Sequence, residues 1–253
     1  MLGSLTRGLR ALPPERAHEL AMRALRLSPR IYAAEAIGAP ATVMGLHFPN
    51  RIGLAAGFDK DGDHINSLAK LGFGFIEVGT ITPQPQPGSP QPRLFRLPAS
   101  KALINRMGFN SRGVEHAARR LAQQGGGFSG VLGCNIGCNR ETDKAEAYKD
   151  YLHCLRRLYG LANYYVINIS SPNTPGLRNM QKPVALNALL RALVSLRDEL
   201  SEQHREKTPL LIKIDPEQSR DQIEAMAEIV QRTGLDGIVA TNTTTRRGRE
   251  VAA

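Results

Sequence analysis

The stretch Asn168-Ile-Ser-Ser-Pro-Asn-Thr-Pro-Gly176 decides how this chain of 253 residues is interpreted. It follows the apolar run Tyr164-Tyr-Val-Ile167, in which aromatic and β-branched residues stand together without a charge. That composition predicts a buried strand. The strand then gives way to amides, hydroxyls and two prolines, and an α/β barrel builds its site from polar residues at the carboxyl ends of its strands. The alternative is an ordinary polar turn, because Ser, Asn and Pro are also common turn residues.

The same arrangement recurs five more times along the chain. Each further run is short and apolar and carries a polar residue at or near its end: Ile52–Lys60, Phe75–Thr80, Val131–Ile136, Leu210–Ile214 and Ile238–Thr244. Between the runs, apolar residues at helical spacing end near a glycine, which is typical of a left-handed helix cap. Strands that alternate with helices predict a parallel sheet. We therefore expect an α/β fold, a (β/α)8 TIM barrel of which about six of eight strands are present.

Composition narrows the choice of partners. Lys and Arg total 33 against 23 Asp and Glu, a formal net charge of +10, which favours nucleic acid, an acidic membrane surface or an anionic substrate. Clustered basic and aromatic residues are missing, so we expect no nucleic-acid partner. Three cysteines without a second Cys/His pair predict a reducing compartment and no metal site. No run of about 18 apolar residues is present, so we expect no transmembrane helix.

Residues 1–40 differ from the remainder, 41–253, which holds the predicted barrel. From Ala17 to Leu25, apolar residues keep helical spacing and arginines line the opposite face, whereas Ser28-Pro29 predicts a second short helix through Ile37. The two helices either pack on the barrel or lie in a membrane interface with their arginines toward anionic headgroups.

A long connection separates the predicted strands at Phe75 and Val131. It spans more than fifty residues and begins with the proline-rich segment Pro83–Pro92, which we expect to be rigid and extended. A long ordered loop on the functional face of a barrel is a candidate lid or substrate wall.

Six strings occur in a specific order along the chain: LAAGFDKDG, GFGFIEVGTITPQPQPG, PRLFRL, INRMGFN, NISSPNTPGLR and ATNTT. Together they make the chain, from about Pro14 to Thr244, resemble dihydroorotate dehydrogenase of the quinone-dependent, membrane-associated class (class 2). The resemblance implies oxidation of dihydroorotate to orotate in de novo pyrimidine biosynthesis, with FMN as hydride acceptor and a quinone as final electron acceptor. It also implies that residues 1–40 form a membrane- and quinone-associated region, that 41–253 hold the FMN and orotate site, and that the protein is peripheral on the cytoplasmic side of the cell membrane.

The resemblance implies a site residue by residue. Ser171 matches the catalytic base, a position that the soluble classes fill with Cys, and Lys60 matches a lysine that contacts substrate and flavin. The other matches to substrate contacts are Asn105, Arg106, Met107, Gly108, Phe109, Asn168, Asn173, Asn242 and Thr243. The matches to FMN contacts are Ala55, Ala56, Gly57, Thr80, Asn135, Asn168, Lys213 and Thr241. Each match also has a purely structural alternative. Ser171 could be a turn serine and Lys60 a solvated surface lysine, the asparagines could be core amides bonded to the backbone, and Thr80 and Asn135 could cap strand ends.

Three departures from the family pattern bear on cofactor binding. Cys138 stands where the family carries a lysine, and Asp215 stands where the family has a small residue and is placed to pair with Lys213. The last two strands of the family barrel, whose glycine-rich loops bind the FMN phosphate, have no counterpart here. We therefore expect an apparently truncated chain that, in isolation, binds FMN poorly and is weakly active or inactive.

Rival interpretations remain open. Another FMN barrel oxidoreductase acting on a pyrimidine ring is one, although such enzymes favour Cys where this chain has Ser171. A non-enzymatic truncated membrane-surface protein is a second, and a nucleic-acid-binding protein, suggested only by the net charge, is a third.

Overall fold

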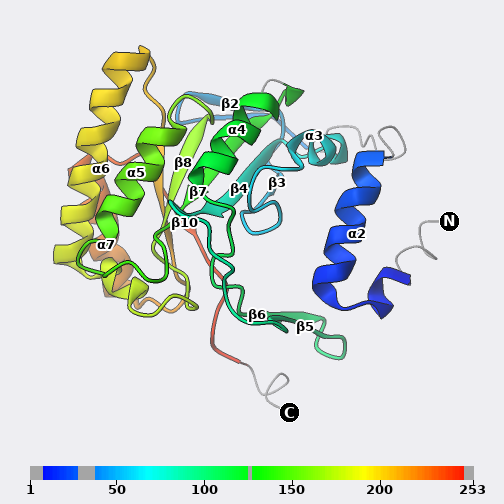
Figure 1. The fold of residues 1–253 in the computed structure, drawn as a ribbon. Helices are drawn as coiled ribbons and strands as arrows, with labels where there is room; N and C mark the ends of the chain where they lie inside the picture. Colours follow the sequence, from blue (N-terminus) through cyan, green and yellow to red (C-terminus); the bar gives the residue numbers. More distant parts are fainter. Residues whose placement is uncertain (1–7, 28–37, 125–126, 248–253) are drawn as a thin grey trace.

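The computed structural model describes residues 8–27, 38–124 and 127–247. Its centre is a sheet of six parallel strands in the spatial order β10-β9-β8-β7-β4-β3 (Figure 1). The strands are β3 (Gly53–Leu54), β4 (Phe75–Ile81), β7 (Val131–Ile136), β8 (Tyr164–Asn168), β9 (Leu210–Ile214) and β10 (Gly237–Ala240). Consecutive strands of this set are neighbours, so the sheet curls as part of a barrel. The predicted α/β architecture with six barrel strands is confirmed.

Helices cover the outer face of the sheet, as the apolar stripes predict (Figure 1). They are α3 (Ile65–Leu68), η1 (Ala69–Leu71), α4 (Val114–Gln124), α5 (Ala147–Leu158), η3 (Leu177–Gln181), α6 (Pro183–His204) and α7 (Arg220–Thr233). The termini of α7 illustrate the local chemistry. Ser219 and Gln222 form a reciprocal capping box at its start, and Gly234 ends it in the left-handed conformation.

The strands bury both faces because their side chains alternate between two apolar clusters. Outward residues such as Ile136, Ile167 and Ile212 pack under the helices. Inward residues at the amino ends, among them Val166 and Leu211, pack with the hairpin β1 (Ala41–Val43) and β2 (Leu46–Phe48). At about 1.5–3 kcal/mol for each buried large aliphatic side chain, these layers supply the main stabilisation. The hairpin thereby fills the amino end of the barrel interior and leaves the carboxyl end to polar residues.

The long connection after β4 is ordered and carries a second hairpin. Its strands β5 (Leu94–Leu97) and β6 (Ala102–Asn105) pair antiparallel and lie beside the helix α2 (Pro14–Leu27) (Figure 1). Arg96 donates to the carbonyl oxygen of Leu12 over 2.6 Å. The first N-terminal helix therefore packs on the body of the protein, as the first of the two alternatives predicts.

The apolar stripe predicted for this helix is only partly right. Ala17 is buried as expected, but Met22 is the large buried residue, and Leu20 is 45% exposed. The predicted second helix, which ends at Ile37, lies outside the described residues. Among the described residues, no helix is long and apolar enough to cross a membrane.

Candidate active site

Three predicted residues form a compact hydrogen-bonded cluster at the carboxyl ends of β4, β7 and β8. The Thr80 hydroxyl donates to Asn135 Oδ1 over 2.6 Å, and Asn168 Nδ2 donates to Thr80 Oγ1 over 2.9 Å and to Asn135 Oδ1 over 3.1 Å. All three side chains are buried. Side chains from three strands meet here because the carboxyl ends of parallel strands lie on one edge of the sheet.

The loop after β3 lines the same end of the sheet with small residues. Ala55 and Gly57 are exposed, and the Gly57 N–H donates to the Gly79 carbonyl oxygen over 2.8 Å. Gly57 has φ 105°, a conformation open to glycine and strained for other residues. The ammonium of Lys60 donates to the Gly57 carbonyl oxygen. Burial, followed by the nearby Arg93 charge, lowers the pKa of Lys60.

The loop after β8 folds back over the cluster. Ser170 donates to Asn168 Oδ1 over 2.9 Å and accepts a hydrogen bond from Asn242 Nδ2 over 3.0 Å, which joins the ends of β8 and β10. Ser171 is buried, and its Oγ accepts a hydrogen bond from the backbone N–H of Asn173 over 3.3 Å. The contact predicted for a turn serine is therefore present, and it also places an N–H donor on the oxygen that a base would use.

The segment at residues 105–109 is brought to the site by the hairpin β5–β6. Gly108 and Phe109 both have positive φ, at 72° and 54°. A Cβ built on Gly137 would lie 2.6 Å from Thr80 Cγ2 and 3.1 Å from the Phe109 ring. Gly137, Thr80 and Phe109 are therefore in close contact, which places Phe109 next to the cluster. Asn105 and Met107 are half-buried in the same segment.

Two groups of predicted residues lie at the rim of the site and bond mainly within their own segments. Arg106 is exposed and donates to the carbonyl oxygen of Pro92 over 2.8 Å, so its side chain bonds within its own connection. Beyond β10, Thr241 and Thr243 are exposed, and the Asn242 side-chain oxygen accepts from the Thr243 N–H over 2.7 Å. The predicted ligand contacts of these residues stay predictions.

Lys213 is buried at 8% exposure on β9, and its charge acts on the buried carboxylate of Glu77. The expected pair between Lys213 and Asp215 is absent from the contacts of the described residues. Asp215 instead accepts from Gln181 over 2.8 Å and from Gln218. β9 ends at Ile214, so Asp215 lies on the segment after the strand, where it bonds to Gln181 and Gln218. Lys213 remains within the strand and points into the barrel.

Cys138, which stands where the family pattern has a lysine, is fully buried. Burial raises the pKa of the Cys138 thiol, and the nearby Lys144 ammonium opposes that rise. Lys144 donates to the carbonyl oxygen of Thr142 over 2.7 Å, and its stem lies under Gly176 of the loop after β8. A positive charge therefore remains close to Cys138.

Sequence reasoning missed several residues that hold the site. Glu77 bonds to Asn135, Tyr151 donates to the Asn168 carbonyl oxygen over 2.9 Å, and Ser170 links Asn168 to Asn242. Glu217 is also missed. Its carboxylate accepts hydrogen bonds from the backbone N–H and the hydroxyl of Thr245, which hold the segment after β10 in place. An acid inside the apolar strand Phe75–Ile81 is the one signal that pointed to Glu77.

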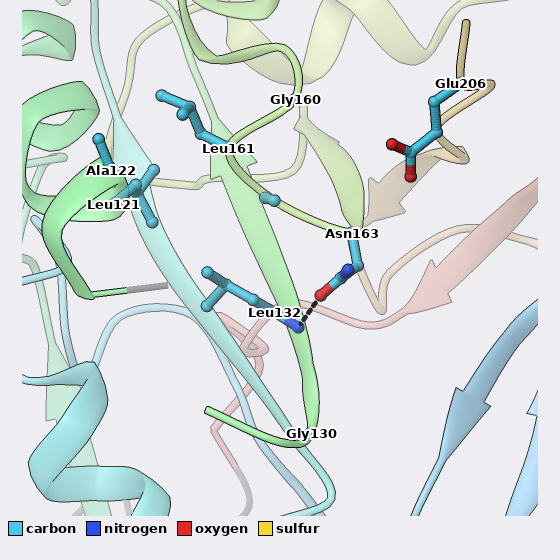
Figure 2. A pocket seen from close by; sticks show the side chains of 9 residues that line it. Leu121, Ala122, Gly130, Leu132, Gly160, Leu161, Asn163 and Glu206 are labelled. Carbon is cyan, nitrogen blue, oxygen red and sulfur yellow. Dashed lines mark hydrogen bonds between the residues drawn. The ribbon is translucent and has the colours of Figure 1, made fainter. Parts of the chain in front are cut away.

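The described residues also line an open pocket of about 310 Å³ at the opposite end of the strands (Figure 2). Leu121, Leu132 and Leu161 line it, and the Leu132 N–H donates to Asn163 Oδ1 over 2.7 Å. It lies at the amino ends of β7 and β8, so none of the predicted site residues reaches it.

The residues at the carboxyl ends fit a flavin. Small residues on the β3 loop leave room beside a flat ring, and amide, hydroxyl and ammonium groups match the N–H and C=O edge of its pyrimidine portion. The fold and site thus define an α/β-barrel protein with a polar site at the carboxyl ends of its strands.

Comparison with known proteins narrows this class. The family model described as dihydroorotate dehydrogenase matches residues 39–252. A dihydroorotate dehydrogenase (quinone) from Thiobacillus denitrificans is 49% identical over 98% of this chain and 74% of its own length. One from Methylococcus capsulatus is 50% identical over 93% of this chain and 70% of its own. The ligand-free DHODH from Eimeria tenella superposes with a TM-score of 0.88 at 37% identity, covering 95% of this chain and 72% of that one. The chain belongs to the dihydroorotate dehydrogenase family.

Proposed function

We propose that this chain oxidises dihydroorotate to orotate in pyrimidine biosynthesis, with FMN as the hydride acceptor and a quinone as the final electron acceptor. One observation carries the proposal: a member of this family has a buried amide and hydroxyl cluster of Thr80, Asn135 and Asn168, and the loop that follows Asn168 carries the buried Ser171. When bound, the flavin supplies the two-electron chemistry that no amino-acid side chain provides.

Ser171 is the proposed base. It would take a proton from the carbon next to a ring carbonyl of the substrate. A serine hydroxyl is a poor base by itself, so its surroundings must favour the oxyanion. The Asn173 N–H donates to Ser171 Oγ over 3.3 Å and is oriented to stabilise that charge. Burial of Ser171 works against that charge, so the Asn173 donor has to offset the cost of desolvation.

The amide groups are proposed to hold the pyrimidine ring. Asn105, Asn173 and Asn242 each offer a donor and an acceptor, which suits alternating N–H and C=O groups. Lys60 supplies positive charge for the substrate carboxylate, and its amine is fixed by the Gly57 carbonyl oxygen. Lys213, Thr241 and the Ala55–Gly57 loop are assigned to the flavin.

An anaerobic visible spectrum of the chain with FMN, taken before and after dihydroorotate is added, tests this function. Bleaching of the flavin band by dihydroorotate supports the proposal. Bleaching by NADPH alone favours the rival pyrimidine oxidoreductase. A chain that retains no flavin agrees with the weak binding expected from the sequence, and soaking it with excess FMN then separates weak affinity from a lost site.

Peripheral membrane association, on the cytoplasmic side of the cell membrane, is proposed for the region 1–40. Support comes from α2, where Arg16, Arg23 and Arg26 are exposed together with Leu27, which is 85% exposed. Flotation with anionic and with neutral vesicles tests it. Exchange of the three arginines for alanine is expected to reduce binding to anionic vesicles only, since each cation near the surface contributes about 1 kcal/mol.

A further inference from the structure

Glu77 lies in the middle of β4 and points into the barrel interior, directly beneath the site. It is 5% exposed. Its Oε1 accepts a hydrogen bond from Asn135 Nδ2 over 2.8 Å, and its Oε2 accepts one from the Tyr164 hydroxyl over 3.3 Å. A buried carboxylate with these partners is a costly group, and it has no place among the contacts proposed for substrate or flavin.

The sheet makes room for one of these contacts with a glycine. Glu77, Gly133 and Tyr164 are register partners on three neighbouring strands. A Cβ built on Gly133 would lie 2.1 Å from Cζ of the Tyr164 ring. The ring therefore lies flat across Gly133, and only glycine at this position lets the tyrosine hydroxyl reach the carboxylate.

The hydrogen bond to Glu77 sets the orientation of the Asn135 amide. With Nδ2 donated to the carboxylate, Oδ1 is the atom that accepts from Thr80 and Asn168. A flipped amide would place its oxygen against an anion and its NH₂ group against the Asn168 NH₂ group. Glu77 thus determines which atoms of the cluster face the site.

Charge gives Glu77 a second role. Burial raises the pKa of Glu77, and the positive charge of Lys213 opposes that rise and favours the carboxylate. Lys213 is itself buried. Both side chains point into the barrel interior, from β4 and β9, and the contacts of the described residues include no direct ion pair between them. A buried cation without an anion nearby is strongly destabilising, so Glu77 is placed to offset the charge of Lys213 through the barrel interior.

We propose that Glu77 is a positioning residue of the flavin site, which fixes the Asn135 amide and balances the charge of Lys213 from inside the barrel. The inference rests on the proposed flavin function. Its consequence is that Glu77 would set the relative affinity of the site for oxidised and reduced flavin, because an anion beneath the Asn135 amide would oppose the negative charge of the reduced form.

The Glu77→Gln variant isolates charge, because glutamine keeps an acceptor for Asn135 and a polar partner for Tyr164. We expect it to favour reduced flavin by roughly tenfold, a rise of about 30 mV in the two-electron potential. Tyr164→Phe is the matched control, since it removes one hydrogen bond and keeps the charge, and its potential should equal that of the parent. An unshifted Glu77→Gln potential, or equal shifts in both variants, overturns the proposal.

A double-mutant cycle on the flavin-free chain tests the interaction between the Glu77 and Lys213 charges independently of flavin binding. Glu77→Gln, Lys213→Gln and the double variant are compared by thermal unfolding. If the charges are paired, the double variant unfolds at a higher temperature than Glu77→Gln alone, and strictly additive losses overturn the pairing. A soluble double variant beside an insoluble Glu77→Gln chain gives the same support. Failure of the parent chain to bind FMN counts against the proposed function, whereas this cycle still decides the role of Glu77.

Discussion

Arg93 donates from Nε to Glu15 Oε1 over 2.9 Å and so joins the N-terminal helix α2 to the long connection after β4. The pair is largely buried, with side-chain exposures of 10% and 23%. Arg93 also donates to the carbonyl oxygens of Pro87 and Ser89, which hold the proline-rich segment. Glu15 therefore connects the helix to an arginine that is already fixed at the edge of the site.

Glu15→Gln is expected to loosen α2 from the barrel. Hydrogen bonds to charged groups contribute about 1.5–3 kcal/mol, so amide exchange along Pro14–Leu27 should accelerate at least tenfold. Hydrogen exchange followed by mass spectrometry measures this. Glu19→Gln is the matched control, because Glu19 is an exposed acid on the same helix. Equal exchange in the two variants would show that the Glu15 contact does not anchor the helix.

Ser171→Ala is expected to slow flavin reduction by dihydroorotate by roughly 10²–10⁴, the usual contribution of a positioned base. Ser170→Ala is the informative comparison, because the Ser170 hydroxyl bonds to Asn168 and Asn242 and is not placed as a base. That variant should weaken substrate binding more than the reduction rate. Stopped-flow absorbance over a series of dihydroorotate concentrations separates the two effects, because the plateau gives the reduction rate and the concentration dependence gives the binding constant. An unchanged plateau rate in Ser171→Ala rules out its role as the base.

The strands and the carboxyl-end site were predictable because they follow from local signals. Apolar runs such as Val131–Ile136 locate the strands, and the parallel order brings their polar ends together. Long-range partners were not predictable, because nothing local to Asp215 reveals that Gln181 binds it. The expected Lys213–Asp215 pair is absent for this reason, because Asp215 lies past the end of β9 and its partner Gln181 comes from a distant segment of the chain.

Glu217 is expected to give the protein an acid-sensitive clamp on the segment after β10. Its carboxylate accepts from the Thr245 hydroxyl and N–H, each over 2.6 Å, and from Arg178 over 2.6 Å. These donors, the Thr245 hydroxyl foremost, lower the pKa of Glu217 from 4.5 to about 2. A lowered folded-state pKa means that the clamp stabilises the folded state fully above about pH 4.5 and loses this effect as the pH falls toward 2.

Thermal unfolding of the parent chain and of Glu217→Gln between pH 2 and pH 7 measures this clamp. The difference between them should be constant above about pH 5, shrink below 4.5 and vanish near 2. Glu224→Gln on α7 serves as control, since its partner Arg220 is exposed and such pairs contribute about 0.3–0.5 kcal/mol. A Glu217→Gln difference that persists unchanged to pH 2 would assign the effect to packing.

Gly133→Ala is expected to destabilise the protein by about 1–3 kcal/mol, the usual cost of an overpacked core. The new methyl group would meet the Tyr164 ring at 2.1 Å, and the ring has no room to move because it lies inside the barrel. Gly237→Ala tests whether any strand glycine is equally sensitive, since a Cβ there meets Leu211 at an ordinary 3.4 Å. We expect Gly237→Ala to be near neutral in chemical denaturation. Equal losses in both variants would mean that backbone freedom, and not the Tyr164 contact, explains the glycine at position 133.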